Sequence, residues 1–444
     1  MKSVLLNFVR YSALIAVSLG LGACAANYPS RTVAYTASAL ETPTQQPSDN
    51  ELLNVRIEAF DPGQLPTDAN ASKGLSMDIR RAESYYVANQ LKAAMQRSGH
   101  WGQVRVIPRG ARDGEVTVRG KILESDGEIL KLSVEVQDAA GVRWFSRTYE
   151  SVVDAAAYAR AEPGRSDAFQ DMYHRIANDI AAYRKQIDQP TVDELRRVSE
   201  LRFGNEFSPQ TYGSHLRRNE QPAQRDDLLG RLTAAFARDP KPSERSPVYV
   251  ADSLPAREDP IVQRVDRIRT RDDYLTDTLD QQYDELARTL ASPYANWRTS
   301  RLREISAIRA ADKAKNEQQA QAVAAGIFGV LLGAALASGN QGGNCPGCTA
   351  AGVGVAAASV VLATQAAVQA SQQAGAEADL RRAALEELGN SLTTDVRATV
   401  VEVEGRTVEL RGTVEEKMRA WREVLEALRE SETGPTLPPA PATS

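Results

Sequence analysis

The segment Cys345–Cys348, with the sequence Cys-Pro-Gly-Cys, holds the residue types that could support redox chemistry. Two thiols at this spacing exchange disulfides readily, because the motif lowers the pKa of the first thiol. The motif lies in a polar loop, however, without the strand-to-helix context of a thiol oxidoreductase. Two thiolates also leave a zinc site half filled, and His100, His174 and His215 are distant in sequence. We expect a structural disulfide between Cys345 and Cys348, with redox catalysis or a metal site as the alternatives.

Other enzyme motifs are missing from the sequence. It contains no nucleophile elbow, no HExxH zinc motif, no phosphate-binding glycine loop and no Ser–His–Asp set. The glycines of 109–114 fit a turn before a strand. We therefore expect no catalytic residues, no metal and no cofactor, that is, a protein that is not an enzyme.

The third cysteine, Cys24, follows a segment with the layout of an export signal. Lys2 and Arg10 precede an uncharged apolar run over 11–21. This run is too short to cross about 30 Å of hydrocarbon, which takes roughly 20 apolar residues in a helix. We expect residues 1–23 to be a signal peptide and not a membrane span.

The residues Leu21-Gly22-Ala23-Cys24 resemble the lipobox of bacterial lipoproteins. The resemblance implies cleavage before Cys24 and attachment of lipid, including palmitate, to its thiol, where several acyl chains give stable anchoring. Ala25 follows instead of Asp, which in the enterobacterial sorting rule favours the outer membrane. We expect a lipoprotein on the periplasmic side of the outer membrane, bound to membrane lipid through Cys24. An ordinary secretory signal with an incidental cysteine is the alternative.

The charge balance argues against nucleic acid as a partner. The 444 residues include 53 Lys and Arg against 58 Asp and Glu, so there is no basic surplus. The length allows two or three domains with cores of their own. Residues 24–50 and 432–444 are rich in Pro, Thr, Ser and Ala, and we expect a disordered tether and a disordered tail.

An α+β N-terminal domain is expected over 51–187. Helical spacing of apolar residues predicts one helix that ends at Gly99 and a second over 167–184. Two helices would then cover one face of an antiparallel sheet. Turns are expected at 126–127 and 140–141. The predicted strands are 55–59, 104–107, 116–118, 122–123, 130–136 and 142–145.

This order of elements, with Ser98-Gly99-His100-Trp101-Gly102 leading into a strand, resembles the periplasmic domains of ABC-transporter auxiliary lipoproteins and of the curli-secretion lipoprotein. The resemblance implies a domain that binds other envelope proteins or forms rings as a homo-oligomer. It carries over no catalytic residues.

A mainly α-helical region is expected after this domain. Prolines break 188–260 into a connector. Apolar residues at alternating four- and three-residue steps then predict a coiled-coil-like helix, and Ser292-Pro293 interrupts it before a second helix. We expect a helical hairpin over 261–320, which either binds a partner or covers the first domain.

The stretch between Glu317 and Glu377 carries no formal charge, so we do not expect it to be a solvated surface. It predicts a glycine-rich apolar hairpin over 321–376, with arms of about 322–338 and 349–370. One expectation is a hairpin that enters or lines a membrane as an oligomer, and the other is a hairpin buried in a soluble helical assembly. Its composition is similar to glycine-zipper segments of outer-membrane lipoproteins. The small residues that would let the two arms pack closely are Gly326, Gly329, Gly333, Gly352 and Gly354.

The last expected region, 377–431, consists of a helix, a small β-hairpin and a second helix. The hairpin is predicted by alternation over 400–412 across a turn at Glu404-Gly405. Met418, Trp421 and Leu425 then lie on one face of an amphipathic helix. The hairpin and helix are similar to half of the BON module, a small lipid- or protein-binding domain, and a plain packing element is the alternative.

Two function hypotheses follow. The first is a non-enzymatic scaffold or assembly factor in a cell-envelope complex. The second is an export-pore subunit or an auxiliary component of a lipid or polymer transporter. Stoichiometry and ion conductance distinguish the two.

Overall fold

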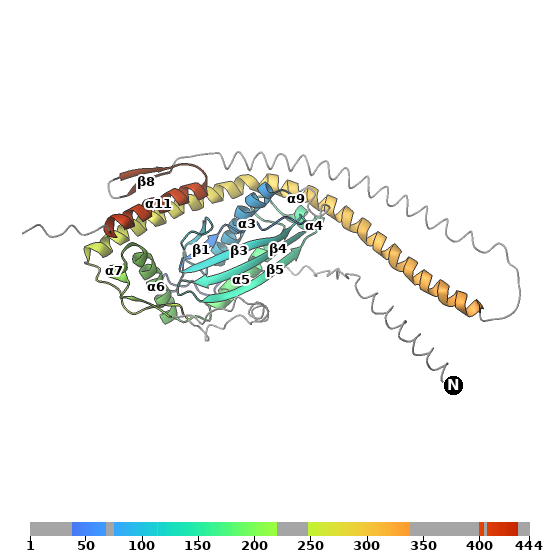
Figure 1. The fold of residues 1–444 in the computed structure, drawn as a ribbon, viewed down its shortest axis with the longest axis horizontal. Helices are drawn as coiled ribbons and strands as arrows, with labels where there is room; N and C mark the ends of the chain where they lie inside the picture. The colour runs from blue at the N-terminus through green and yellow to red at the C-terminus, as the bar shows by residue number, and fades with distance from the viewer. Residues whose placement is uncertain are drawn as a thin grey trace, which may run out of the picture. The chain divides into compact units, whose positions relative to one another are not determined.

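The computed structural model describes residues 38–67, 75–112, 114–219, 247–337, 399–403 and 406–433. These residues all belong to one compact unit, Ser38–Ser444. The signal segment and Cys24 lie outside the described residues. At the coarsest level the expected fold is confirmed: a mixed α/β domain with a five-stranded sheet is followed by helices and by a C-terminal strand pair with a helix (Figure 1).

The sheet has the strand order β2-β1-β3-β4-β5 and is mixed. β1 runs parallel to both β2 and β3, while β3, β4 and β5 are antiparallel. The expectation of an antiparallel sheet is therefore wrong for β1, because a helix connects β1 to β2 and a helical crossover brings two strands together in parallel. The strands are β1 (Val55–Glu58), β2 (Val104–Ile107), β3 (Val116–Ser125), β4 (Ile129–Asp138) and β5 (Arg143–Val152).

Two helices, α3 (Met77–Ser98) and α5 (Gln170–Arg184), pack on one face of the sheet, as expected. α3 begins where the Ser76 hydroxyl accepts the Ile79 N–H at 3.2 Å, and it ends at Gly99 in the left-handed conformation, φ 69°. Apolar side chains of both helices and of alternate strand positions form one core. The opposite face of the sheet carries Arg56, Arg105 and Thr117, and the apolar Ile107 of β2 lies on it as well.

Residues 38–50, which belong to the expected disordered tether, are held against α5 and the next helix. The Ser38 carbonyl lies 2.8 Å from His174 Nδ1, and the Ala39 carbonyl accepts a hydrogen bond from Asn178 Nδ2 at 2.8 Å. Side chains of α5 thus form hydrogen bonds with main-chain carbonyls that would bond to water in a disordered segment. The expectation is wrong for 38–50, and 24–37 lie outside the described residues.

The expected connector 188–260 is also part of the folded unit where it is described. Val192, Leu195 and Val198 are fully buried in the core that underlies the sheet. Proline at the start of α6 fits its first turn, where no intrahelical N–H is needed. The elements of this region are α6 (Gln189–Phe207), α7 (Pro209–Tyr212), β6 (Leu216–Arg218) and β7 (Tyr249–Ala251). A short helix, α4 (Ala155–Arg160), lies earlier in the chain, between β5 and α5.

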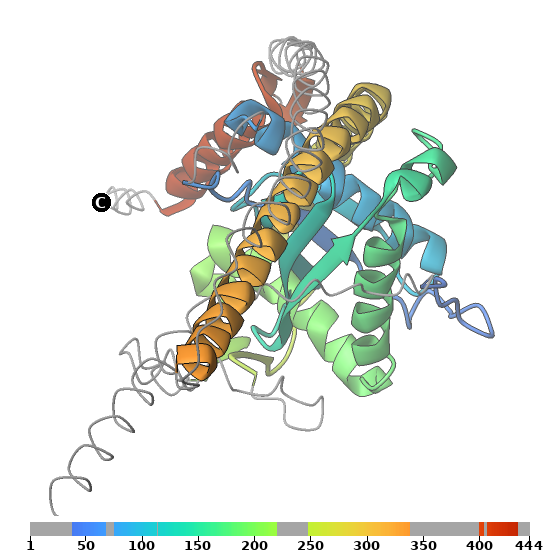
Figure 2. The same ribbon diagram turned by 90° about the vertical axis from the view of Figure 1, so that its right-hand side faces the viewer.

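The expected helical hairpin is a single helix, α9 (Pro260–Ala337), of 78 residues. It passes through Pro293 and bends along its length without turning back (Figures 1 and 2). A proline inside a helix costs about 3 kcal/mol. The helix continues because Tyr294 and Trp297, directly after the proline, are buried against Ile79 and Tyr86 of α3. Packing therefore overrides the break that the sequence predicts.

The C-terminal hairpin and helix form as expected. β8 (Thr399–Val403) pairs antiparallel with β9 (Arg406–Leu410), and α11 (Val414–Thr433) follows. Thr413 and Glu416 form a reciprocal capping box at the start of α11. Trp421 is fully buried in a second core that includes residues of α6 and α9. The hairpin and α11 are thus packed onto the rest of the unit.

Candidate functional site

Two arginines on neighbouring strands project from the polar face of the sheet. Arg56 on β1 lies opposite Arg105 on β2 in the parallel register. Side chains alternate along a strand, so Val55 and Val104 point to the core that α3 and α5 cover, while the two arginines point away from it. Arg112, in the loop between β2 and β3, adds a third guanidinium nearby.

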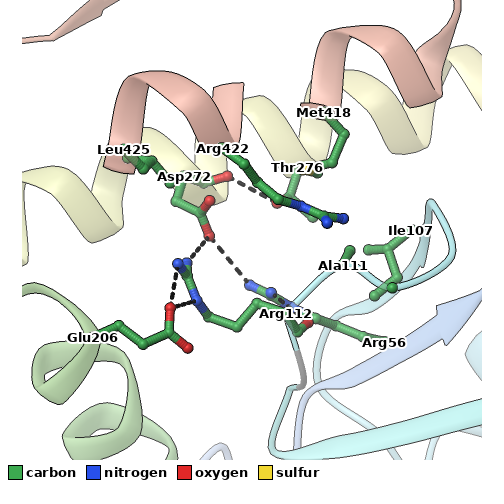
Figure 3. Close-up of a pocket in the computed structure, with 11 residues that line it drawn as sticks. Arg56, Ile107, Ala111, Arg112, Glu206, Asp272, Thr276, Met418, Arg422 and Leu425 are labelled. Atoms are coloured by element: carbon green, nitrogen blue, oxygen red, sulfur yellow. Dashed lines mark hydrogen bonds and ion pairs between the residues drawn. The ribbon is translucent and has the colours of Figure 1, made fainter. Parts of the chain in front are cut away.

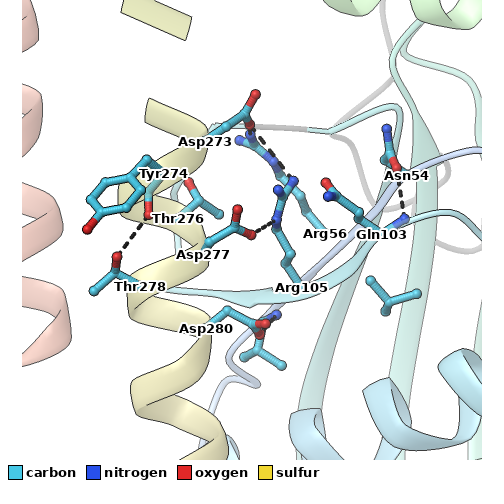
Figure 4. A network of polar contacts seen from close by, with 12 residues as sticks. Asn54, Arg56, Gln103, Arg105, Asp273, Tyr274, Thr276, Asp277, Thr278 and Asp280 are labelled. Carbon is cyan, nitrogen blue, oxygen red and sulfur yellow. Dashed lines mark hydrogen bonds and ion pairs between the residues drawn. The ribbon is translucent and has the colours of Figure 1, made fainter. Parts of the chain in front are cut away.

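The first half of α9 carries the acids that meet these arginines. Asp273 and Asp277 are four residues apart and so lie on the same face of the helix. Asp273 Oδ1 lies 3.3 Å from Arg56 Nη2, and Asp277 accepts a hydrogen bond from Arg105 Nε (Figure 4). This face of α9 is therefore attached by charge to the first two strands of the sheet.

Asp272 joins three elements. Its Oδ2 lies 3.3 Å from Arg112 Nη1 and 3.9 Å from Arg56 Nη2, and its Oδ1 accepts a hydrogen bond from Trp421 Nε1 at 3.1 Å. The Thr276 hydroxyl one turn later donates to the Asp272 carbonyl at 2.8 Å, which ties this hydroxyl to the helix. Asp272 thus connects α9 to the sheet domain and to α11.

Asp280 completes the row of acids. Its Oδ1 accepts the main-chain N–H of Val106 on the edge strand β2 at 2.7 Å, and its Oδ2 lies 2.6 Å from Lys92 Nζ. Lys92 also contacts Asp284 at 2.8 Å. Burial raises the pKa of Asp280, and the hydrogen bonds from Lys92 and Val106 oppose the rise.

α11 is fixed by polar contacts toward its N-terminal end as well. Glu415 accepts hydrogen bonds from the hydroxyls of Tyr85 on α3 and Tyr283 on α9, the latter at 3.1 Å. The two tyrosine rings stack with centroids 5.1 Å apart. Lys417 Nζ donates to Gln282 Oε1 at 3.1 Å. α11 is therefore held at Glu415 and Lys417 as well as at Trp421.

A cavity of about 200 Å³ lies where the sheet, α6, α9 and α11 meet (Figure 3). Arg56, Arg112 and Arg422 line it together with Glu206 and Asp272. A second cavity of about 80 Å³ on the side of β1 and α6 shares Arg56 and Arg112 with it. The apolar part of the wall of the larger cavity is formed by Ile107, Ala111, Met418 and Leu425.

The arginines of this cleft differ in how well their charge is compensated. Burial lowers the pKa of Arg56; Asp272 and Asp273 raise it, and the nearby Arg112 and Arg105 lower it further, so it stays below the usual arginine value. Burial also lowers the pKa of Arg112, but Asp272 and Glu206 outweigh this effect and raise it. Arg56 is therefore the less compensated cation. Such a cleft is suited to bind an anion or to hold elements together.

The candidate site residues named from the sequence, which are the cysteines and the glycines of the apolar hairpin, are not among the residues that line the larger cavity. Gly326, Gly329 and Gly333 lie on the last part of α9, which confirms a helix for most of the first apolar arm. Cys24, Cys345, Cys348, Gly352 and Gly354 lie outside the described residues, so lipidation, the disulfide and close packing of the arms stay predictions. Among the described side chains, no group of three or more His, Cys, Asp or Glu could hold a metal ion.

The arginines and aspartates of the cleft escaped the sequence analysis. The acids appear there as polar spacers in a coiled-coil pattern. Residues 109–114 appear as a turn, and the structure has a turn at Arg109 and Gly110. The signal that could have found the site is the crowding of acids on one helix face, at 272, 273, 277, 280 and 284, near a helix start that is otherwise rich in arginine.

Comparison of the chain with known protein families, with curated proteins and with solved structures finds no match. Within the described ranges, no helix is both long and apolar enough to span a membrane.

Proposed function

We propose that this protein is an outer-membrane lipoprotein that faces the periplasm and acts as a non-enzymatic scaffold or assembly factor in a cell-envelope complex. The observation that carries the proposal is α9, one helix whose first part is attached to the α/β domain and whose last part continues beyond it (Figure 1). A long helix held at one end on a folded domain presents a binding surface at a set distance from that domain.

The attachment of α9 extends from the acid row to Arg309. At that point Arg309 Nη2 lies 2.6 Å from Asp126, and its Nη1 pairs with Glu128, both in the turn between β3 and β4. Residues 310–337 then continue as helix for roughly 42 Å at 1.5 Å per residue. The uncharged run begins within this stretch, after Glu317. A stretch of sequence without charged residues favours contact with other envelope proteins or with a second copy over contact with water.

The lipid anchor would keep the domain close to the membrane. Ser38, whose carbonyl contacts His174 on α5, follows Cys24 by about 14 chain steps of at most roughly 3.6 Å each. The α5 side of the domain would therefore lie within about 50 Å of an anchor at Cys24. This distance limits which envelope components can contact the arm of α9, residues 310–337.

The test combines the anchor with the arm. A photo-crosslinking amino acid at Ala310, where α9 leaves the turn, should give a discrete crosslinked product in intact cells. The same group at Thr270, exposed on the attached half of α9, is the matched control. Cys24→Ser should release the protein from the envelope fraction and remove the Ala310 product. A Cys24→Ser protein that matures and fractionates unchanged would contradict the lipoprotein, and no product at Ala310 would contradict the scaffold.

A second candidate is an export-pore subunit or an auxiliary component of a lipid or polymer transporter. It is favoured by the uncharged, glycine-rich run that begins on α9. Detergent-extracted rings that open ion-conducting holes in planar bilayers would support this candidate. A monomer or a stable complex with a different protein, without conductance, would support the scaffold.

A further inference from the structure

The larger cavity has one more positive than negative charge in its wall. Three guanidinium groups and two carboxylates line it. Both carboxylates contact Arg112, Glu206 at 2.8 Å and Asp272 at 3.3 Å. Arg56 is 3.9 Å from Asp272, and its closer partner, Asp273, is outside the wall of this cavity.

Arg422 supplies the excess charge. It lies on α11 with an exposed side chain, and within the described part of the chain no carboxylate pairs with it. Figure 3 shows its guanidinium extending from α11 into the space between Thr276 and Ala111. Arg56 and Arg422 thus reach the cavity from opposite walls, from β1 and from α11.

The remaining wall sets the kind of ligand. Met418 and Leu425 flank Arg422 on the same face of α11, and Ile107 lies across from them. A volume of about 200 Å³ equals the space of roughly seven water molecules. An inorganic ion leaves much of such a space, and the apolar side chains around it, without contacts. A small organic group carrying an oxyanion would contact both parts.

We propose that this cavity binds a phosphate ester, with the phosphate between Arg56 and Arg422 and the organic part against Met418 and Leu425. Guanidinium forks match phosphate oxygens in geometry and donate charge-assisted hydrogen bonds to them. The excess positive charge of the wall is complementary to an anionic group such as this one. The site requires neither lipid on Cys24 nor the arm of α9, so it is independent of the function proposed above.

The test is isothermal titration calorimetry on the full chain in a non-ionic detergent, at constant ionic strength. The probes are glycerol 3-phosphate, inorganic phosphate and acetate. We expect one saturable site for glycerol 3-phosphate, with weaker binding of acetate. Arg422→Gln should weaken glycerol 3-phosphate binding about tenfold, the loss typical of one charge-assisted hydrogen bond. Arg419→Gln, an exposed arginine on the same helix outside the cavity wall, should leave binding unchanged.

The probes also distinguish the source of the phosphate. Tighter binding of glycerol 3-phosphate than of inorganic phosphate supports an ester such as a lipid headgroup, because the organic part then contributes. Equal affinity for glycerol 3-phosphate and inorganic phosphate would mean that the cavity binds free phosphate. That result would overturn the proposal of a phosphate ester as the ligand. No saturable binding up to millimolar concentration, or equal loss in the Arg419→Gln and Arg422→Gln proteins, overturns the site.

Discussion

The carboxylate of Asp280 accepts a hydrogen bond from the main-chain N–H of Val106 at 2.7 Å, across 174 residues of sequence. Val106 lies on β2, an edge strand whose outer main-chain groups have no strand neighbour among the described residues. An exposed edge invites pairing with other chains, and covering it removes that risk. A side chain of α9 therefore helps to close this edge of the sheet.

Replacing Asp280 tests this contact. Asp280→Ala leaves the Val106 N–H without its acceptor and leaves Lys92 with Asp284 alone, so we expect a loss of about 2–4 kcal/mol in unfolding free energy. Asp280→Asn retains an oxygen for Val106 and should lose less. Asp277→Ala, which removes a carboxylate that is 46 % exposed, should cost under about 1 kcal/mol. Urea unfolding followed by circular dichroism measures all three. Equal losses in Asp277→Ala and Asp280→Ala would contradict the edge role.

The buried pair Asp167 and Arg298 predicts a loss of stability in acid. Burial alone would raise the pKa of Asp167, but the charge and hydrogen bonds of Arg298, with hydrogen bonds from Phe169 N–H and Tyr86, bring it below its usual value. A carboxyl with a lowered folded pKa stabilises the fold above the unfolded pKa, about 3.9 for aspartate, and this contribution disappears as the pH falls through the folded pKa.

The measurement compares the wild type with Asp167→Asn across pH. We expect the wild type to be more stable by about 3–5 kcal/mol between pH 5 and 7, because the variant leaves Arg298 buried without a counter-charge. The difference should shrink as the pH falls below about 4. A difference that stays constant down to pH 2 would show that the charge of Asp167 does not contribute. Asp193→Asn, at a half-exposed site on α6, is the control.

Gly127 shows how closely α9 approaches the turn between β3 and β4. Its φ is 92°, and a Cβ there would lie 2.8 Å from the Arg298 carbonyl oxygen and 3.1 Å from the Leu302 nitrogen. Gly164 has a similar φ of 86°, but a Cβ there meets nothing within 4 Å. Gly164→Ala should cost about 1 kcal/mol from backbone strain alone, and Gly127→Ala about 1–3 kcal/mol more because α9 must move. Thermal unfolding compares them, and equal costs would mean that α9 yields freely at this turn.

Pro293 predicts a stabilising substitution. Pro293→Ala restores a helical N–H and removes a ring clash worth about 3 kcal/mol, less about 1 kcal/mol for the freer unfolded chain. We expect a gain of about 1–2 kcal/mol in unfolding free energy, seen as a higher Tm. Ser292→Ala, at the exposed neighbouring position, should change stability by under about 0.5 kcal/mol. A lower Tm for Pro293→Ala would show that the bend at the proline is required by the packing on α3.

Local features of this protein were predictable from sequence. The end of α3 at Gly99, the turns at 126–127 and 140–141, and the hairpin of β8 and β9 all depend on residues within a few positions of each other. Hydrophobic periodicity and glycine at left-handed positions report such local geometry directly. The same reasoning placed most strands, although it divided β3 into two.

The wrong predictions concern choices that distant residues make. The direction of β1 depends on the helical crossover through α3. The continuity of α9 through Pro293 depends on burial of Tyr294 and Trp297 against α3. For β1, the connecting helix sets the direction, and not the residues of the strand itself. For α9, packing on α3 outweighs the local signal of the proline, and Ile79 and Tyr86 lie more than 200 residues before it in sequence.

The residues that sequence alone singled out were the cysteines and glycines, because their chemistry or small size is recognisable without neighbours. Tertiary structure alone decided the cleft. Arg56 is 217 residues away from Asp273, and Arg105 is 172 residues away from Asp277. A charged side chain in sequence looks the same whether water or an opposite charge will surround it. Only the packing of α9 against β2 brings these opposite charges together and turns these residues into a site.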